Sequence, residues 1–406
     1  MRLKFNDKTL ILMLLTGLLL KLSLALLPGF KIDVDAWFAW AFRLTELPFS
    51  EFYSDQVWTN YTPGYLYILW LSGLINNLFN LIPEQFYFLL KVPSIVAEIF
   101  LAFISYHLVK SEVNIKWARV TAAFILFNPG FIFNSSIWGQ VDGFLSLLMF
   151  LSIFFLSHKK LSLASIFFAL SILIKPQALA LSPIFLFYVI KNFNKQTINL
   201  IYPGLLTLLI LSFPFFVSNP LLGLPNLIIQ MSNDYASTSL FAYNFWGIVG
   251  FWIDDQKNFL GLTYQMVGIV LFVTFWILTA YFYFKKNLNL YIISTLACLA
   301  FYFLPTRAHE RYLYPALVFA AISAAYLNSQ RIFILTSLLS LTYLINLYYV
   351  YIYYNVFYSH TDQSLYLKSF YDLLNRQGKL LSFISTALFG FLSFNLIKYG
   401  HKKITK

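Results

Sequence analysis

The segment TRAHERY carries side chains that could act on a phosphate-bearing substrate. Four charged or ionisable residues fall within five positions, between two apolar runs: Arg307, His309, Glu310 and Arg311. A guanidinium group can bind two phosphate oxygens at once, and a histidine or carboxylate beside it can transfer a proton. A solvated turn is the alternative, but a simple turn does not need this combination. The segment therefore predicts a substrate-binding site for an anion.

Two aspartates stand in a second polar stretch, KIDVDAWFAWAFRL. A carboxylate within hydrogen-bond reach of a hydroxyl can act as a general base, and Asp33 is the candidate for that role. Aspartate before a helix is also a common N-cap, and capping explains Asp35 as well as substrate binding does. Asp33 stands one step further out and is less well explained by capping. We assign Asp35 to substrate binding.

A third polar group interrupts the apolar stretch FNPGFIFNSSIWGQVDGFLSLL at the outer end of a predicted helix. Gln140 and Asp142 are costly in such surroundings unless they line a polar cavity. The alternatives are an aromatic-belt position for Trp138 and a cap of the next helix for Asp142. We assign all three residues to substrate binding.

Three further candidates for substrate binding stand alone in apolar or aromatic sequence. Lys175 would lie near membrane depth, where an ionisable residue is by default functional, although its ammonium group can also extend toward the surface. The Lys175-Pro176 pair breaks a helix, so the two legs of 161–190 are expected to be short helices that meet below the outer surface. Asn244 and Trp246 in YNFWG are residue types that contact sugars, and a position at the membrane interface explains them nearly as well.

The elements that must position these residues are transmembrane helices. The chain has 406 residues, of which 60% are hydrophobic and 11% are charged, too few to cover a water-facing surface. Apolar runs close to the roughly 20 residues that cross a bilayer as a helix recur at 8–28, 197–217 and 332–355. The single cysteine, Cys298, lies in an apolar run and allows no internal disulfide. The sequence predicts an all-α, polytopic membrane protein.

Basic clusters between the apolar runs set the expected topology. Lysine and arginine mark cytoplasmic loops, so topology and anionic lipids explain the net charge of +12 better than nucleic acid does. If Lys8 and Lys110 are both cytoplasmic, the run 64–82 between them is the one expected to stay outside or re-enter. This predicts about twelve transmembrane helices in a plasma (inner) membrane, with both termini cytoplasmic and the active site on the outer face.

The chain is expected to form a single membrane domain over residues 1–406. Residues 29–85 form a large first external loop with an interfacial helix, DVDAWFAWAFRLTE, and an embedded or re-entrant helix, GYLYILWLSGLINNLF. The catalytic helical core is expected at 86–320 and a group of C-terminal helices at 321–406. No internal repeat is visible, so the inverted halves of many transporters are not apparent.

Six motifs occur in a familiar order: DVDAWFAWA, FYSDQVWTNYTPGYLYILW, NPGFIFNSSIWGQVD, IKPQ, YNFWG and TRAHERYLYPAL. Together they resemble the prokaryotic membrane proteins similar to GPI mannosyltransferase II, within the GT-C glycosyltransferase superfamily. The resemblance spans residues 30–320. It implies a GT-C-like fold of many helices, with a large first external loop that carries the catalytic aspartate.

The resemblance also implies an enzyme that moves a hexose, with mannose as one candidate, from a polyprenyl-phosphate donor, usually with inversion. Asp33 matches the family's loop-one aspartate and would be the catalytic base. Asp142 falls where related enzymes often have a second acidic residue. Arg307, His309 and Arg311 fall where the donor phosphate is expected. The expected partners are the polyprenyl-phosphate sugar donor, membrane lipids and a glycan, lipid or protein acceptor.

Two other functions remain open on the sequence. A transporter or flippase of lipid-linked glycans would bind the same headgroup without chemistry. Its ionisable groups should lie near the membrane midplane on broken helices, whereas most of those here fall in outer loops. A non-catalytic scaffold would not need the TRAHERY cluster. No cofactor is evident, and two or three separated carboxylates could hold a divalent metal or simply contact hydroxyls.

Overall fold

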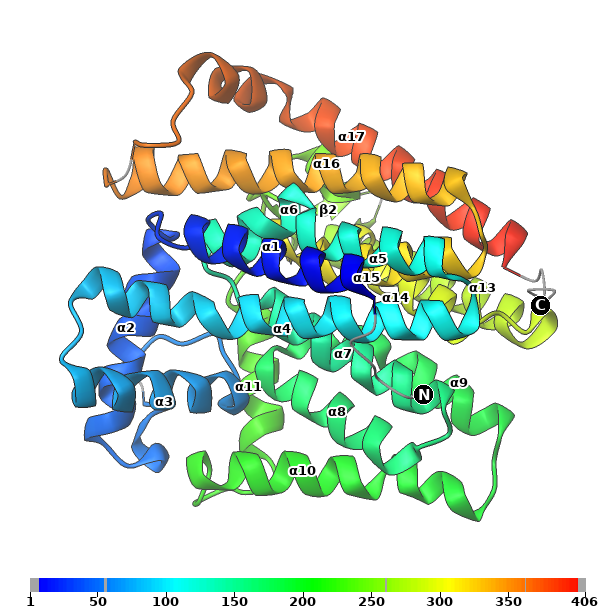
Figure 1. The fold of residues 1–406 in the computed structure, drawn as a ribbon, viewed down its shortest axis with the longest axis horizontal. Helices are drawn as coiled ribbons and strands as arrows, with labels where there is room; N and C mark the ends of the chain where they lie inside the picture. Colours follow the sequence, from blue (N-terminus) through cyan, green and yellow to red (C-terminus); the bar gives the residue numbers. More distant parts are fainter. Residues whose placement is uncertain (1–6, 55–56, 260, 362, 401–406) are drawn as a thin grey trace.

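The computed structural model of the protein describes residues 7–54, 57–259, 261–361 and 363–400. Regular structure in these residues is almost entirely helical, and most helices run along one common direction (Figure 1). In that view α17 ends at the right-hand end of the molecule and α1 begins to the right of its middle, whereas the turn from α3 to α4 lies at the left-hand end.

The helices are α1 (Lys8–Leu24), α2 (Lys31–Glu46), α3 (Pro63–Phe79), α4 (Pro83–Glu112), α5 (Ile115–Phe127), α6 (Pro129–Ile132), α7 (Asp142–Ser157), α8 (Leu161–Ile174) and α9 (Ser182–Lys191). They continue with α10 (Tyr202–Ser212), α11 (Gly223–Asn233), α12 (Phe245–Val249), α13 (Tyr264–Lys286), α14 (Leu290–Phe303), α15 (Tyr314–Tyr326), α16 (Gln330–Ile352) and α17 (Lys368–Tyr399). Short 3-10 turns occupy Phe49–Glu51, Pro176–Leu181, Lys195–Leu200, Phe213–Phe215 and Glu310–Leu313, and π-helical turns occupy Phe133–Trp138 and Tyr353–Tyr358.

Local sequence signals explain where several of these helices begin. The side-chain oxygens of Asp7, Asn114 and Asn289 accept hydrogen bonds from backbone N–H groups in the first turns of α1, α5 and α14. These caps satisfy donors that have no partner inside the helix. Proline opens α3 and α4, where its missing N–H costs nothing.

Six helical stretches of the described chain are long and apolar enough to cross a membrane, judged by length and composition. They are Pro83–Glu112, Ile115–Trp138, Lys195–Phe215, Tyr264–Lys286, Gln330–Tyr358 and Lys368–Tyr399. These stretches suggest an integral membrane protein. The prediction of about twelve transmembrane helices is therefore wrong in its number.

The count fails because several apolar runs form helices too short to span a bilayer. α7, α8 and α14 contain 16, 14 and 14 residues, against the roughly 20 that a full crossing needs. Each has one end at a polar turn, because α7 starts at Asp142, α8 stops before Lys175 and α14 stops shortly before Arg307. The short legs expected for 161–190 are present as α8 and α9, joined by the turn Pro176–Leu181.

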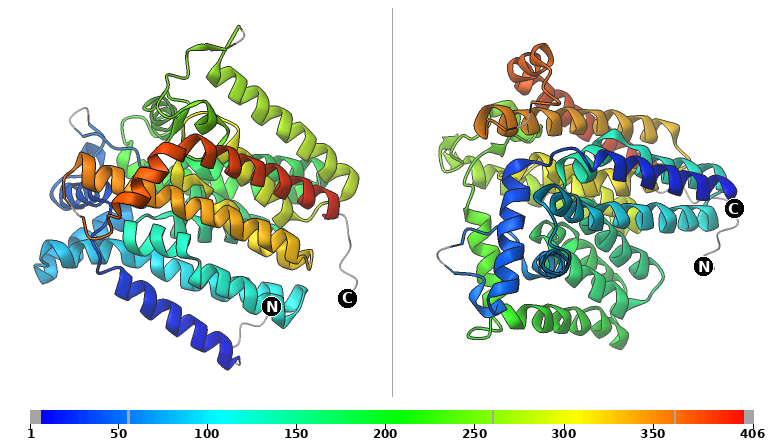
Figure 2. Two further views of the ribbon diagram at one scale, coloured as in Figure 1. Left: turned by 90° about the horizontal axis from the view of Figure 1, so that it is seen from above. Right: turned by 60° about the vertical axis from the view of Figure 1, so that its left-hand side comes forward.

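The first predicted loop contains two helices of different direction. α2 runs across the common direction, as α11 does, whereas α3 lies along it (Figures 1 and 2). α2 packs against α3, and the backbones approach so closely that a Cβ on Gly73 would lie 2.7 Å from the carbonyl oxygen of Ala41. Trp37 and Trp40 of α2 are both buried. The Trp37 ring packs against Tyr65 of α3, and the Trp40 ring packs against Tyr61, which precedes α3. These tryptophans therefore face protein, in contrast to the lipid-facing position that an interfacial helix would give them.

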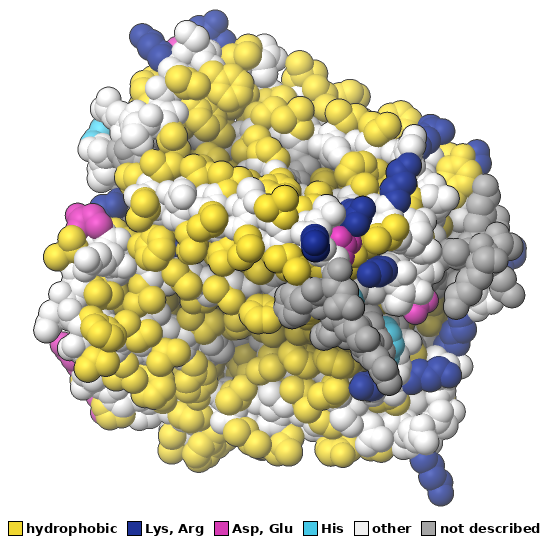
Figure 3. Space-filling view, viewed as in Figure 1, with side chains coloured by type: hydrophobic (Ala, Val, Ile, Leu, Met, Phe, Trp, Pro, Cys, Tyr) yellow, Lys and Arg dark blue, Asp and Glu magenta, His cyan; other side chains and the backbone are white. Residues whose placement is uncertain are grey.

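The face of the molecule shown in Figure 3 is largely apolar. Over the molecule as a whole, the large apolar side chains that are exposed include Leu12 on α1, Leu71 on α3 and Leu341 on α16. Lysine and arginine side chains gather mainly toward the end where α1 begins and α17 ends (Figure 3). An apolar belt with basic residues at one end is the distribution expected of helices in a lipid bilayer.

A buried ion pair joins α1 to α4. The Lys21 ammonium lies 2.7 Å from a carboxylate oxygen of Glu98, and both side chains are completely buried. Hydroxyl groups of Ser135 and Tyr314 donate to the same carboxylate. Removal of one partner from such a pair leaves an uncompensated charge, so this group fixes α1 against the core.

Two short strand pairs shape the loops near the polar turns. β1 (Ser239–Leu240) lies parallel to β4 (Ala308–His309), with Ser239 opposite Ala308 and Leu240 opposite His309. β2 (Asn258–Phe259) and β3 (Leu262–Thr263) form an antiparallel pair. The first pair fastens the loop after α11 to the TRAHERY segment, which brings side chains from both around one space.

Candidate active site

Two side chains from the turn that follows α6 hold the carboxylate of Asp33. Nε1 of Trp138 donates a hydrogen bond to Oδ2 at 2.8 Å, and the amide nitrogen of Gln140 donates to the same oxygen. Within the described residues Oδ1 accepts no hydrogen bond, and the side chain is partly exposed. One oxygen of Asp33 is thus fixed while the other can meet a substrate hydroxyl.

The observed start of α2 removes the capping explanation for both aspartates. The helix begins at Lys31, with Phe30 at the N-cap and no side-chain cap. Asp33 stands in the first turn, where the helix dipole favours a carboxylate. Asp35 instead forms a 2.7 Å ion pair with Lys31 and accepts a 2.8 Å hydrogen bond from Tyr87. It lines neither of the cavities described below.

A break in the helix that starts at Ile115 places Trp138 and Gln140 beside Asp33. The side chain of Asn128 caps a new helical turn after Pro129, and a π-helical turn then ends at Gly139. Gly139 has a φ of +97°, a conformation that L side chains rarely adopt. π-Helical turns occur frequently at functional sites, because they redirect side chains.

A buried polar chain continues from Gln140 to α7. The Gln140 amide oxygen accepts hydrogen bonds from Tyr61 at 3.1 Å and from the Lys175 ammonium at 2.9 Å. Lys175 also forms a 2.7 Å ion pair with Asp142, whose other oxygen accepts a 3.0 Å bond from Asn134. Asp142 is completely buried and Lys175 is 5% exposed. The two charges therefore compensate each other, and Asp142 does not reach a cavity.

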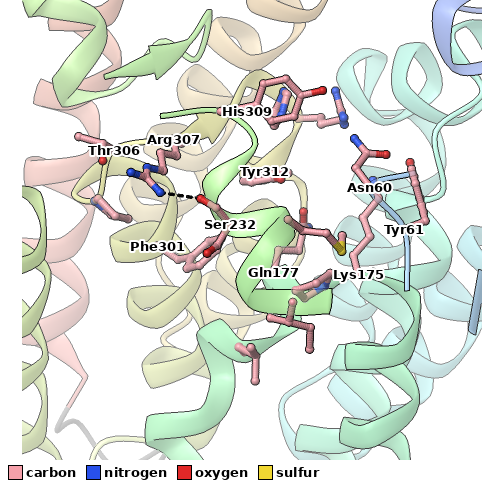
Figure 4. Close-up of a pocket in the computed structure, with 18 residues that line it drawn as sticks. Asn60, Tyr61, Lys175, Gln177, Ser232, Phe301, Thr306, Arg307, His309 and Tyr312 are labelled. Atoms are coloured by element: carbon pink, nitrogen blue, oxygen red, sulfur yellow. Dashed lines mark hydrogen bonds between the residues drawn. The ribbon is translucent and has the colours of Figure 1, made fainter. Parts of the chain in front are cut away.

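A cavity of about 320 Å³ lies between the turn after α8, helix α11 and the TRAHERY segment (Figure 4). Three cationic side chains line it, namely Lys175, Arg307 and Arg311. Its apolar lining includes Leu179, Ile228, Met231 and Phe301. We call this space the cationic cavity. Its mixed lining suits a ligand that has both an anionic group and a hydrocarbon part.

A second cavity of about 140 Å³ adjoins the first and contains Asp33 in its wall. We call it the Asp33 cavity. Both cavities are lined by the same four residues where they meet: Asn60, Tyr235, His309 and Arg311. The structure therefore places Asp33 and Arg311 around one space, with the cationic cavity behind Arg311.

Arg307 is fully engaged by protein groups. Its Nε and NH2 atoms bind the two carboxylate oxygens of Asp255 at 2.7 and 3.2 Å, and NH1 donates to the backbone oxygen of Ser232 at 2.7 Å (Figure 4). Burial acts to raise the pKa of the Asp255 carboxyl, but hydrogen bonds from Arg307 and Thr306 outweigh it and lower that pKa. The Arg307–Asp255 pair joins the loop before β2 to TRAHERY, and the guanidinium group has little capacity left for phosphate.

The remaining three members of the cluster form a compact group. Arg311 lies 2.9 Å from Glu310, and Nδ1 of His309 lies 3.7 Å from the other oxygen of Glu310. Nε of Arg311 is buried without a hydrogen-bond partner in the described residues. Burial and the positive charge of Arg311 lower the pKa of His309, so the neutral imidazole is favoured. Among the described residues the Arg311 guanidinium donates only through NH1, to Glu310, and the side chain lines both cavities, so it can bind an anion there.

Asn244 and Trp246 lie away from both cavities. Asn244 caps α12 through Gly247 and donates to the backbone oxygen of Tyr302 at 2.9 Å. Nε1 of Trp246 donates to the backbone oxygen of Leu304 at 2.7 Å, and both side chains are buried. These bonds fix the end of α14 that precedes TRAHERY. The side-chain nitrogens of both residues thus donate to backbone oxygens of the protein, and neither residue lines one of the two cavities.

No three histidine, cysteine, aspartate or glutamate side chains gather as a metal site in the part of the chain that the structure describes. Asp142 and Asp255 each compensate a cation, and Glu310 is paired with Arg311. Only Asp33 among these carboxylates is free of an ion pair.

Sequence reasoning missed several cavity residues. Trp58, Tyr235 and Trp252 line the Asp33 cavity, and Tyr61 lines the cationic cavity. The available signal was the polar sequence around the two tryptophans, VWTN and FWIDDQKN, which sets them apart from residues inside apolar runs. Asp255, which neutralises Arg307, lies in the second of these stretches.

No protein-family model matches the chain, and no curated protein matches it. The resemblance of the six motifs therefore remains an expectation. The function below is proposed from the two cavities and the residues that line them.

Proposed function

We propose that the protein is a glycosyltransferase that moves a hexose from a polyprenyl-phosphate donor to an acceptor hydroxyl. One observation carries the proposal: Asp33 and Arg311 line the same cavity, and Arg311 also lines the adjoining cationic cavity. In this proposal a base for the acceptor and a partner for the donor phosphate would meet where the two cavities join. Proximity of this kind is a main source of catalytic rate.

The cationic cavity would hold the donor. Its apolar wall suits the first part of a polyprenyl chain. The guanidinium of Arg311, which among the described residues pairs only through NH1, can donate to a phosphate oxygen. Arg307 and Lys175 contribute positive potential, but their hydrogen bonds go to Asp255 and Asp142. We therefore assign direct phosphate binding to Arg311 and an indirect role to the other two cations.

Asp33 would act as the general base. Its Oδ1 takes the proton of the acceptor hydroxyl while the acceptor oxygen bonds to the anomeric carbon of the donor sugar. The bond from that carbon to the phosphate oxygen breaks with its electron pair, and the polyprenyl phosphate leaves with one more negative charge. Arg311 stabilises this charge as it develops. Attack from the side opposite the leaving group inverts the anomeric centre.

The orientation that we expect for the molecule in the membrane supports an active site on the outer side. The basic end in Figure 3 would face the cytoplasm under the positive-inside rule. α2, which carries Asp33, leads into the turn before α3, and the α3–α4 turn lies at the opposite end of the molecule (Figure 1). We accordingly propose that both termini are cytoplasmic and that the substrates meet on the outer side of the membrane, with the first loop 29–85 external.

A transporter of lipid-linked glycans is the second candidate, and one observation favours it. Lys175 and Asp142 are buried at the break between α8 and the turn Pro176–Leu181, and broken helices with ionisable residues are typical of transporter sites. Lys175 was predicted near membrane depth, whereas Asp142 was predicted at the outer end of a helix, and the structure pairs the two. The carboxylate of Asp33, which has no cation, favours the enzyme because transport does not need a base.

Reconstituted protein decides between the two functions. Proteoliposomes would receive polyprenyl-phosphate hexoses labelled in the sugar, together with sugar, lipid and peptide acceptors. A glycosyltransferase moves the label to an acceptor, and Asp33→Asn slows this transfer strongly. Transbilayer movement of intact labelled donor, unchanged in Asp33→Asn, would instead identify a transporter.

A further inference from the structure

The Asp33 cavity has an aromatic wall with two exposed tryptophans. Trp58 is 54% exposed and Trp252 is 41% exposed, and both line the cavity together with Tyr235 and Tyr354. Both rings are accessible at the cavity wall and can therefore contact a ligand that enters it. Their place around a cavity that contains Asp33 indicates a ligand-binding role for this wall.

The conformation of Trp252 supports that role. Its φ is +57°, in the left-handed region that is a genuine outlier for a bulky residue. The backbone is held there because its N–H donates to the carbonyl oxygen of Ser239 at 2.9 Å. The indole meets Tyr235 and Phe241 edge-on, at 6.2 and 5.7 Å between ring centroids. Strain of this kind persists where the surroundings fix a side chain, and it gathers at ligand sites.

Trp58 comes from a different loop, between α2 and α3. Its ring lies 6.3 Å from that of Trp40, which is buried in α2. The loop therefore rests on the same helix that carries Asp33. Since Trp58 and Trp252 stand in the polar sequences VWTN and FWIDDQKN, their surroundings are those of a water-facing loop and not of a lipid-facing helix.

The rest of the cavity supplies polar groups at its edge. Asp33, Asn60 and Arg311 line it beside the aromatic residues. A pyranose ring has the matching chemistry, because its faces present C–H groups and its edges present hydroxyls. A hydrocarbon acceptor would leave the polar groups without partners, which is costly in a buried site.

We infer that Trp58 and Trp252 form a saccharide subsite in the Asp33 cavity, so that the acceptor hydroxyl belongs to a sugar. The inference rests on the proposed function for the reaction, but sugar binding can be measured without transfer. Of the three expected classes of acceptor, which are glycan, lipid and protein, the inference selects a glycan that enters the cavity from the aqueous side.

The test measures binding of methyl α-mannoside, methyl α-glucoside and methyl α-galactoside to the full chain in lipid nanodiscs. Sugar-based detergents are avoided, because they would compete for the same site. Saturation-transfer NMR reports contact of the sugar C–H groups with protein, and tryptophan fluorescence gives the affinity. A polyprenyl phosphonate analogue of the donor is added in a second series, to separate the acceptor subsite from the place of the donor sugar.

Matched variants locate the site. Trp252→Ala should weaken binding of the hexoside roughly tenfold or more, whereas Trp252→Tyr retains an aromatic face and should change it by less than about threefold. Trp58→Ala should weaken it in the same direction. Trp70→Ala serves as the control, because Trp70 lies on α3 and does not line the cavity. Thermal unfolding and gel filtration of each variant check that the fold is retained.

Binding that survives the donor analogue and is lost in Trp252→Ala supports the inference. Absence of binding for every hexoside overturns it, as does equal binding in all variants or displacement of the hexoside by the donor analogue. Transfer of a labelled hexose to a peptide or lipid hydroxyl, with no hexoside binding, would keep the proposed function and reject the saccharide subsite. Hexoside binding without any transfer of label would keep the saccharide subsite and reject the proposed function.

Discussion

The ammonium of Lys175 lies 2.7 Å from Asp142, and the two charges are buried together at the break after α8. The same ammonium donates to the Gln140 amide oxygen, and the Gln140 amide nitrogen donates to Asp33. Lys175 therefore fixes which way the Gln140 amide points. It acts on Asp33 through Gln140 and is a positioning residue in this arrangement.

Removal of the Lys175 charge should destabilise the protein strongly. Lys175→Met leaves Asp142 as an uncompensated buried charge, and such losses cost about 3–5 kcal/mol. We expect a large fall in the thermal unfolding temperature, measured in nanodiscs. The double variant Lys175→Met/Asp142→Asn removes both charges and should recover much of the stability.

Turnover of the double variant distinguishes a positioning role of Lys175 from a purely structural one. If Lys175 orients Gln140, the double variant should fold well yet transfer sugar slowly, with donor affinity nearly unchanged. A double variant with wild-type turnover would show that the pair is only structural. A large loss of donor affinity would instead assign Lys175 to direct phosphate binding.

Asp33→Asn should lower turnover by about 10²–10⁴-fold, because an amide fills the same space but cannot accept the proton. Donor binding should change little, since Asp33 contacts the acceptor. The matched control is Asp35→Asn, the same chemical change two residues further along α2, where the side chain pairs with Lys31 outside the cavity. Initial rates and donor titrations on both variants test the assignment. Full activity of Asp33→Asn would refute it.

The topology predicts that the first loop is reached from outside the cell. Single cysteines at Asn60 and Glu84, in a Cys298→Ser background, should react with a membrane-impermeant maleimide in intact cells. Lys159→Cys, in the exposed turn between α7 and α8, should react only after permeabilisation. Native Cys298 is buried, so even wild-type protein should give little background. Labelling of Glu84→Cys only from the cytoplasm would reverse the proposed position of α3.

Three polar side chains that the structure brings together could be predicted from the sequence. Asp33, Gln140 and Arg311 stand out because charged and amide groups are rare in apolar sequence. Tyr235 and Trp252 did not stand out, because 20% of the chain is aromatic and one more aromatic residue carries little information. The sequence could not show that Asp255 occupies Arg307, since nothing in the spacing pairs two loops so far apart.

The number of helices that span the membrane could not be predicted from the sequence either. Apolar runs show where helices form, but not how deep their ends lie. α7, α8 and α14 stop at polar turns around the cavities, so each is shorter than a full span. A count of apolar runs cannot distinguish such helices from complete crossings. The fold class follows from composition, whereas the depth of each turn follows from tertiary packing.

Acidification should reduce stability through His309. Burial and Arg311 lower its pKa below the ordinary value of about 6.5, although the nearby Glu310 acts in the opposite direction. Tyr235 and Tyr312 pack against the ring and carry no charge at neutral pH, and Asp33 favours the charged form. The folded protein therefore binds fewer protons here than the unfolded chain, so its stability is retained above pH 6.5 and lost as the pH falls through the folded-state pKa.

Thermal unfolding of wild type and His309→Gln between neutral and mildly acidic pH tests whether protonation of His309 lowers stability. The unfolding temperature of wild type should fall relative to that of His309→Gln as the pH decreases below 6.5. A difference that stays constant would show that the His309 pKa is the same in both states. A difference that grows in favour of wild type would show a raised pKa.

Substitution of Arg311 should mainly weaken donor binding, whereas substitution of Arg307 should mainly lower stability, although both residues line the cationic cavity. Arg311→Ala removes a guanidinium that lines both cavities and, among the described residues, is paired only through NH1, so the phosphate loses a charge-assisted hydrogen bond. Bonds of this strength contribute about 1.5–3 kcal/mol, and the dissociation constant of the polyprenyl-phosphate donor should rise roughly 10- to 150-fold. Arg307→Ala instead leaves Asp255 without its cation, so it should lower the unfolding temperature and affect donor binding less. Donor titrations by tryptophan fluorescence, with unfolding temperatures measured in parallel, compare the two variants. Equal losses of donor affinity in both would show that the phosphate binds Arg307 directly and that the Arg307–Asp255 pair opens when the donor enters.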